Sequence, residues 1–134
     1  MTFTFRPLGE PDLPRLYEWL NRPHLIEHWG PPPTLDEIRE KYLPRMTGSS
    51  TDEPYVAYLG DKPAGYVQSY VAIETEDGWW PGQHDPGVFG IDLFLAHPED
   101  LDRGLGTEMV AEFVRVLFTN PSVTRIQVDP SPKN

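Results

Sequence analysis

The stretch that decides the fold is LAHPEDLDRGLGTEMVAEFV, residues 95–114. An apolar run over 88–96 leads into it and is typical of a central strand, whereas the residues after 104 carry apolar side chains at helical spacing. Gly104-Leu105-Gly106 lies between them, although each glycine inside a helix costs about 1 kcal/mol relative to alanine. The pattern predicts a strand, a glycine turn and a helix over 104–118, whose buried face carries Met109, Val110, Phe113, Val114 and Leu117.

The remaining elements are predicted outward from this unit. Alternating side chains over 2–8 indicate a strand, and helical spacing after Pro11 places Leu13, Leu16, Tyr17 and Leu20 on one face. A capping box over 34–37 opens a helix that we expect to end at Pro44. Strands over 54–59, 64–73 and 123–128 complete the order β-α-α-β-β-β-α-β. This order predicts an α/β fold with a mixed sheet flanked by helices and a strand–helix–strand crossover over 88–128.

The amino-acid composition excludes several classes of function. The 134 residues are enough for one domain with one modest core, and the chain contains no cysteine, which excludes disulfides, thiolate metal sites and cysteine nucleophiles. A net charge of −10 argues against a nucleic-acid partner and favours a cationic ligand, although an acidic surface also keeps ordinary proteins in solution. The sequence shows neither a signal stretch nor a membrane span, so we expect a cytoplasmic protein without a membrane partner.

The glycine turn has the design of an anion site. The first N–H groups of a helix lack intrahelical partners, the helix dipole places partial positive charge there, and glycine lets a phosphate approach the backbone. Arg103 adds a full charge at the rim. The spacing matches neither a dinucleotide fingerprint nor a Walker A loop, and an ordinary tight junction between strand and helix explains Gly-x-Gly equally well.

Seven blocks together carry a family resemblance. The blocks are YEWLNRPH (17–24), PTLDEIREKYLP (33–44), GYVQSYVA (65–72), DGWW (77–80), DPGVFGID (85–92), RGLGTEMV (103–110) and VDPSPKN (128–134). With them the chain resembles the GNAT acetyltransferases, and within these the aminoglycoside 6′-N-acetyltransferases, from Phe5 to Asn134. The GNAT signature [QR]-x-x-G-x-[GA] is matched with Leu101 in place of its polar residue.

The resemblance implies a mostly antiparallel GNAT sheet and acetyl-CoA as cosubstrate, without a metal. It implies acetyl transfer to the 6′-amine of an aminoglycoside, a cationic small molecule, and hence antibiotic resistance. The central strand splays from its neighbour in this fold to admit the coenzyme, and the glycine turn binds its diphosphate. The coenzyme residues implied are Leu93, Phe94, Leu95, Arg103, Gly104, Leu105, Gly106, Thr107 and Asn134.

Asp92 is the candidate catalytic residue. Aspartate is depleted in strands and seldom buried without a partner, yet Asp92 stands in the most apolar strand. The resemblance implies that it binds the acceptor ammonium and receives its proton. Because a carboxylate of ordinary pKa is a poor base for an ammonium at neutral pH, a raised pKa, relay through water and electrostatic stabilisation stay open. A buried aspartate satisfied by backbone amides is the alternative.

The substrate side is implied by further matches, each with a plainer interpretation. Asp77 and Asp129 would hold amines of the antibiotic, but a turn and a loop cap explain them as well. The indoles of Trp79 and Trp80 would line the cleft, with Trp29 and Gln68 beside them. Trp29 fits a packed loop anchor equally well. Gln68 fits an outward-facing strand residue.

The resemblance also implies structure beyond the last residue. The family continues after VDPSPKN with a helix and two strands, so we interpret residues 1–134 as a single GNAT-like domain that is incomplete at its C-terminus. The activity of the 134-residue chain is therefore an open question, and we expect homodimerisation through the exposed edge of its last strand. Two other functions stay open, a siderophore-type lysine N-acyltransferase and a non-catalytic module that binds polycations or coenzyme A.

Overall fold

The computed structural model describes residues 3–48, 52–71, 87–101 and 103–128. Its elements in chain order are β1 (Phe3–Pro7), the 3₁₀ turn η1 (Glu10–Asp12), α1 (Leu13–Leu20), α2 (Pro23–Trp29), α3 (Leu35–Met46), β2 (Glu53–Leu59), β3 (Lys62–Val71), β4 (Val88–Leu95), the 3₁₀ turn η2 (Pro98–Asp100), α4 (Leu105–Leu117) and β5 (Arg125–Val128).

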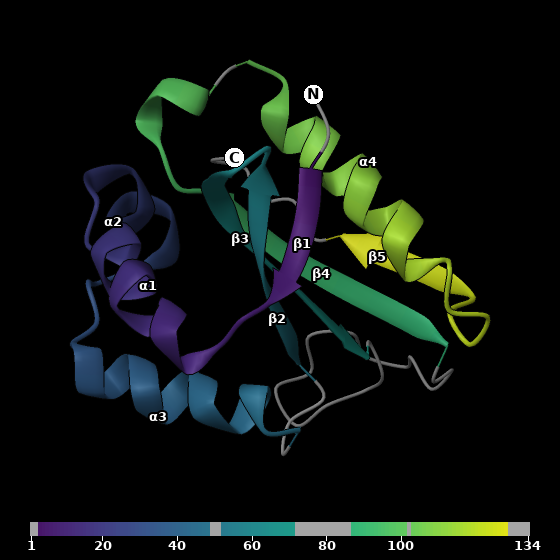
Figure 1. Ribbon diagram of the computed structural model, residues 1–134, viewed down its shortest axis with the longest axis horizontal. Coiled ribbons are helices and arrows are strands. Elements are labelled where there is room, and N and C mark those ends of the chain that lie inside the picture. Colours follow the sequence, from purple (N-terminus) through teal and green to yellow (C-terminus); the bar gives the residue numbers. More distant parts are fainter. Residues whose placement is uncertain (1–2, 49–51, 72–86, 102, 129–134) are drawn as a thin grey trace.

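The five strands form one mixed sheet in the order β1-β2-β3-β4-β5. Neighbouring strands are antiparallel except for β4 and β5, which run parallel because α4 carries the chain back to the start of β4. The predicted α/β class and the crossover over 88–128 are therefore confirmed. Figure 1 shows β3 and β4 in the middle of the sheet, where both neighbours of each strand are strands.

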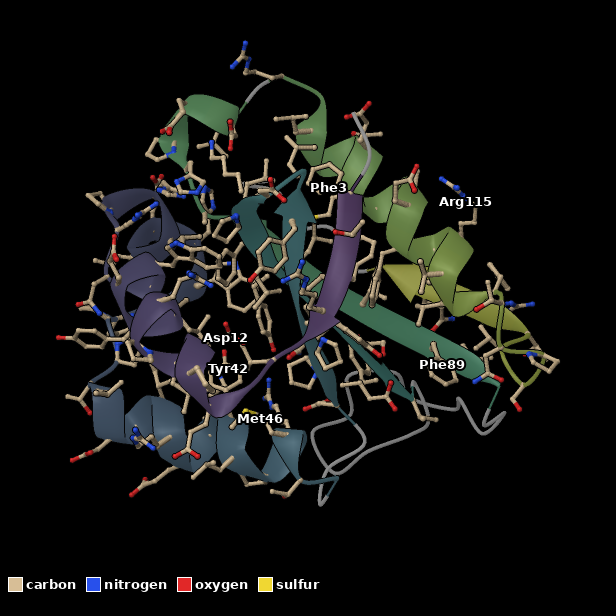
Figure 2. The ribbon with its side chains drawn as sticks, in the orientation of Figure 1. Phe3, Asp12, Tyr42, Met46, Phe89 and Arg115 are labelled. Carbon is tan, nitrogen blue, oxygen red and sulfur yellow. The ribbon has the colours of Figure 1, made fainter. Side chains whose placement is uncertain are left out.

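Helices cover both faces of the sheet (Figure 1). On one face, α1, α2 and α3 pack over Val56, Tyr66 and Phe94. On the other face, α4 packs over Val67 and Ile91. Figure 2 shows Phe3 beside α4, while Arg115 extends from the outer side of that helix into solvent. The alternation of side chains along each strand thus separates two cores, one for each layer of helices.

The helices differ from the prediction in three ways. The segment α2 was not predicted, because only Leu25 of its seven residues is buried and the periodic signal is therefore weak. The helix α3 continues past Pro44 to Met46, since a proline so near the end removes only one backbone bond. Finally, Tyr17 is 40% exposed, and Trp19 lies in the core of the first face instead.

The start of α4 differs slightly from the prediction. Gly104 is the N-cap and lies outside the helix in the left-handed region at φ 75°, where glycine is favoured because it lacks a Cβ. Its carbonyl oxygen accepts the first helical bond from the N–H of Glu108. No helix in the described part of the chain is long and apolar enough to cross a bilayer.

Candidate active site on the central strands

A chain of hydrogen bonds joins β3 and β4 on the face that α3 covers. Gln68 and Asp92 are directly opposite each other in the antiparallel register, and Gln68 Nε2 donates to Asp92 Oδ2 at 2.9 Å. Asp92 is half-buried, whereas Gln68 is 7% exposed. Tyr66 lies two residues before Gln68 on the same face and donates its hydroxyl to Gln68 Oε1 at 2.6 Å. Gln68 is therefore an inward-facing residue with polar partners, and the outward-facing interpretation is wrong.

Aromatic rings surround this polar pair. The ring of Phe94 stacks on Tyr66 with centroids 5.5 Å apart, and Trp29 meets Phe94 edge-on at 5.2 Å. Tyr42 from α3 contacts Tyr66 edge-on at 5.7 Å. Figure 2 shows Tyr42 reaching from α3 toward the interior. Trp29, at the end of α2, is 36% exposed, so it forms a rim over this aromatic group rather than part of its buried interior.

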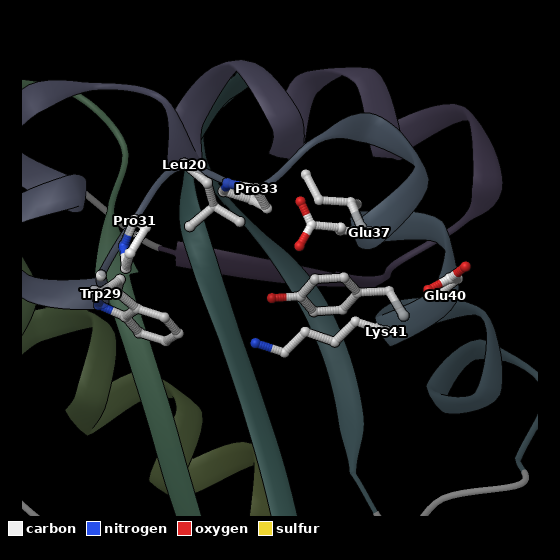
Figure 3. A pocket seen from close by; sticks show the side chains of 10 residues that line it. Leu20, Trp29, Pro31, Pro33, Glu37, Glu40 and Lys41 are labelled. Atoms are coloured by element: carbon white, nitrogen blue, oxygen red, sulfur yellow. The ribbon is translucent and has the colours of Figure 1, made fainter.

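A pocket of about 470 Å³ opens beside these rings. Trp29 lines one side and Lys41 and Glu37 line another, as Figure 3 shows. Burial lowers the pKa of the Lys41 amine, the positive charge of Arg45 lowers it further, and the carboxylates of Asp52 and Asp92 partly oppose both effects. The pocket therefore combines aromatic surface with charges of both signs, a lining that suits a polar ligand with amino groups.

The pairing of β4 with β5 covers only the first half of β4 in the described part of the chain. Within the described residues, the parallel pairing ends at Ile91 and Val128. The Gly87 carbonyl on this side accepts from Thr124 N at 2.7 Å, and backbone groups alternate in direction along a strand. Leu93 and Leu95 therefore direct their backbone groups to the same side. The Leu95 carbonyl accepts from His24 Nε2 at 3.0 Å, and within the described residues no strand residue is paired with Leu93 on this side.

The first turn of α4 lies next to the second half of β4. The side chains of Leu105 and Leu95 pack in the same hydrophobic cluster beneath this turn. In the described part of the chain, a Cβ added to Gly104 would meet no heavy atom within 4 Å, and one on Gly106 would meet only Leu95 Cδ1 at 3.9 Å. Gly104 and Thr107 in this turn are exposed, and the exposed Arg103 is at its rim. These features fit an extended ligand with a diphosphate.

Comparison with known proteins decides the family. Residues 9–134 match the acetyltransferase (GNAT) domain family. The chain belongs to the GNAT acetyltransferases. It is 50% identical to aminoglycoside N(6′)-acetyltransferase type 1 of Klebsiella pneumoniae over 98% of this chain and 67% of the relative, so it spans about two thirds of that relative's length.

Solved structures and a more distant relative complete the comparison. A structure of the aminoglycoside acetyltransferase AAC(6′)-Ib with coenzyme A and kanamycin superposes with a TM-score of 0.91 at 50% identity, covering 99% of this chain and 77% of that one. The lysine N-acyltransferase MbtK of a Mycobacterium species is 28% identical over 98% of this chain and 54% of the relative. The predicted GNAT fold and N-acetyltransferase class are therefore confirmed.

The GNAT fold brings together part of the predicted site. The face of the sheet that α1, α2 and α3 cover carries Asp92 and Gln68, and the rings of Trp29 and Phe94 meet on the same side. The other predicted coenzyme residues lie on the second half of β4 and in or just before the first turn of α4, and are Leu93, Leu95, Arg103, Gly104, Leu105, Gly106 and Thr107. The predicted residues Asp77, Trp79, Trp80, Asp129 and Asn134 lie outside the described residues. Among those described, no group of three His, Asp or Glu side chains could hold a metal.

Sequence analysis missed Tyr66 and the residues that α3 contributes. Tyr66 could have been found, because it alternates with Gln68 along β3 and must share its face. Tyr42 and Arg45 lie three residues apart on α3, one turn of a helix. Ending the predicted helix at Pro44 removed Arg45 from that face and hid this signal.

The buried tyrosines predict how stability depends on high pH. Burial raises the pKa of Tyr66 well above its ordinary value, and burial also raises the pKa of Tyr42. The unfolded chain therefore loses these protons first, so the free energy of unfolding falls as pH rises above about 10. Tyr66→Phe should flatten this fall by up to about 1.4 kcal/mol per pH unit in urea titrations. Tyr17→Phe, at an exposed hydroxyl, is the control, and an equal slope in Tyr66→Phe and wild type would contradict the prediction.

Proposed function

We propose that this chain transfers the acetyl group of acetyl-CoA to the 6′-amine of aminoglycoside antibiotics. The observation that carries the proposal is the carboxylate of Asp92 on β4, which accepts a hydrogen bond from Gln68 and interacts electrostatically with Lys41 of the pocket lining. Half of all residues match an aminoglycoside 6′-N-acetyltransferase, which supports this substrate over the lysine derivatives suggested by the more distant relative.

Each part of the site is assigned a task in this proposal. The pocket beside Trp29 receives the antibiotic, whose sugar faces and ammonium groups pack against the rings. The backbone of Leu93 and Leu95 and the first turn of α4 bind acetyl-CoA, and the N–H of Leu93 polarises the thioester carbonyl. Asp92 orients the 6′-ammonium and receives its proton directly or through water.

The transfer needs no covalent enzyme intermediate. The neutral amine attacks the carbonyl carbon of the thioester, a C–N bond forms and the C–S bond breaks. Coenzyme A leaves as a thiolate, and the second proton that the nitrogen loses passes to this thiolate through water, whereas the first proton went from the ammonium to Asp92 or water before the attack. The product carries an amide in place of an ammonium. Loss of that positive charge would weaken the electrostatic attraction of the antibiotic to a polyanionic target.

Turnover with a matched pair of substrates tests the proposal. We expect saturable binding of acetyl-CoA by calorimetry and release of free thiol with kanamycin as acceptor. Paromomycin, which carries a hydroxyl in place of the 6′-amine, is the control and should release none. Turnover only on hydroxylated lysine would support the siderophore-type alternative, and binding without any turnover would support a non-catalytic module. A cytoplasmic location and a homodimer stay predictions, and light scattering that gives a monomer would contradict the homodimer.

A further inference from the structure

The amide of Gln68 is held in one orientation by two donors. Arg45 Nη1 donates to Gln68 Oε1 at 2.5 Å, and the Tyr66 hydroxyl donates to the same oxygen at 2.6 Å. A guanidinium can only donate, so the amide must present its oxygen to Arg45 and never its NH₂ group. The NH₂ group is consequently directed at Asp92 Oδ2, 2.9 Å away.

Arg45 is itself fixed from two directions. Its Nε forms an ion pair with Asp52 Oδ2 at 3.3 Å, and its guanidinium lies over the Tyr42 ring, 5.0 Å from the centroid. Only 16% of the side chain is exposed. Because the guanidinium is planar, these contacts leave its Nη1 group one direction, toward Gln68.

We propose that Arg45 is a positioning residue of the acetyl transfer, which holds the Asp92 carboxylate in its working orientation through the Gln68 amide. The inference rests on the proposed function and adds to it a residue that touches neither substrate. Without Arg45, only the Tyr66 hydroxyl contacts the Gln68 oxygen, and because a hydroxyl can accept as well as donate, the amide can turn over and bring its carbonyl oxygen against the carboxylate. Two acceptors then face each other, and Asp92 rotates away from the position it needs for the acceptor amine.

In this proposal Arg45 acts on Asp92 through Gln68. The effects of substituting Arg45 and Gln68 on kcat should therefore not be additive. Arg45→Met and Gln68→Leu should each lower kcat with kanamycin about tenfold, which is the size of one hydrogen bond to a charged group. The double variant should lose no more than Gln68→Leu alone, because Arg45 has nothing left to act through. The dissociation constant of acetyl-CoA should stay at its wild-type value in all three.

Arg39→Met is the matched control. Arg39 lies on the same helix and forms an exposed ion pair with Glu10 at 2.8 Å, far from Gln68 in the structure. Its kcat should equal that of the wild type. A purely structural role for Arg45 predicts a lower melting temperature and losses that multiply in the double variant. That result, or an unchanged kcat in Arg45→Met, overturns the proposal.

A spectroscopic measurement separates this proposal from the proposed function. The NH₂ resonances of Gln68, assigned by their loss in Gln68→Leu, should shift in Arg45→Met and remain in place in Arg39→Met. If wild-type protein fails to acetylate kanamycin, the proposed function fails, and unchanged Gln68 resonances in Arg45→Met would overturn the positioning role separately. Should Arg45→Met not fold, Tyr66→Phe removes the second donor to the same oxygen while keeping the ring. Its Gln68 resonances and kcat should then change in the same direction.

Discussion

Asp92→Asn should lower kcat with kanamycin by about 10²- to 10⁴-fold, the range that one general base contributes. Asparagine has the size of aspartate and still offers an oxygen to Gln68 Nε2, so the contact across β3 and β4 survives. It lacks the negative charge that holds an ammonium and the basicity that takes its proton. We therefore expect the melting temperature and the acetyl-CoA dissociation constant to stay close to the wild-type values.

The control for this substitution is Asp61→Asn. Asp61 is an exposed carboxylate in the turn between β2 and β3, away from the pocket, so its kcat should equal that of the wild type. Steady-state kinetics and calorimetry measure both variants. A kcat for Asp92→Asn within about twofold of wild type would remove Asp92 from the reaction, because a lost general base is worth far more than that.

Phe113→Ala should have the largest effect on stability, a loss of about 4 kcal/mol in the free energy of unfolding. The side chain of Phe113 is 0% exposed and packs from α4 in one cluster with Val67 and Ile91 of the sheet. Its ring lies edge-on to Phe5 at 5.0 Å and to Tyr55 at 5.5 Å. Truncation removes these contacts and leaves a cavity between two layers that cannot collapse, because the strands are fixed by their backbone bonds.

The matched control is Phe118→Ala, the same substitution just beyond the end of α4. Phe118 is 49% exposed, so its loss should cost less than about 1 kcal/mol. Urea denaturation measures both variants, with a shift of the midpoint at constant slope indicating a change in stability alone. Equal losses in the two variants would contradict the assignment of Phe113 to the core that joins α4 to the sheet.

The sequence predicted well those elements whose signals are local. The capping box at the start of α3 is present, with Thr34 Oγ1 accepting from Glu37 N at 3.1 Å. Met109, Phe113 and Leu117 are buried on α4 as their spacing predicts. Asp92 was singled out because an acidic side chain in an apolar strand is a chemical anomaly that can be seen without any partner. Periodicity, caps and anomalies of this kind depend on a few neighbouring residues.

Other features were hidden because their causes lie far away in the chain. The segment α2 is held at its start by Arg22, whose Nη1 donates to the Ala96 carbonyl at 2.6 Å, 74 residues further on. The prediction ended α3 at Pro44 because of the proline alone. The contacts of Arg45 and Met46 keep the last turn of the helix in place. The role of Gln68 depends on the register that sets it opposite Asp92.

The sequence by itself determined the order of the elements other than α2, the faces that most of them bury, the glycine turn and the acidic residue at the centre, because each follows from short-range backbone preferences and side-chain spacing. Only the tertiary structure decided that Arg45, Gln68 and Asp92 form one connected chain and that, within the described residues, the pairing of β4 with β5 ends at Ile91. The physical reason is that hydrogen bonds between strands and helices depend on register and packing, which many distant residues fix together and no single segment encodes.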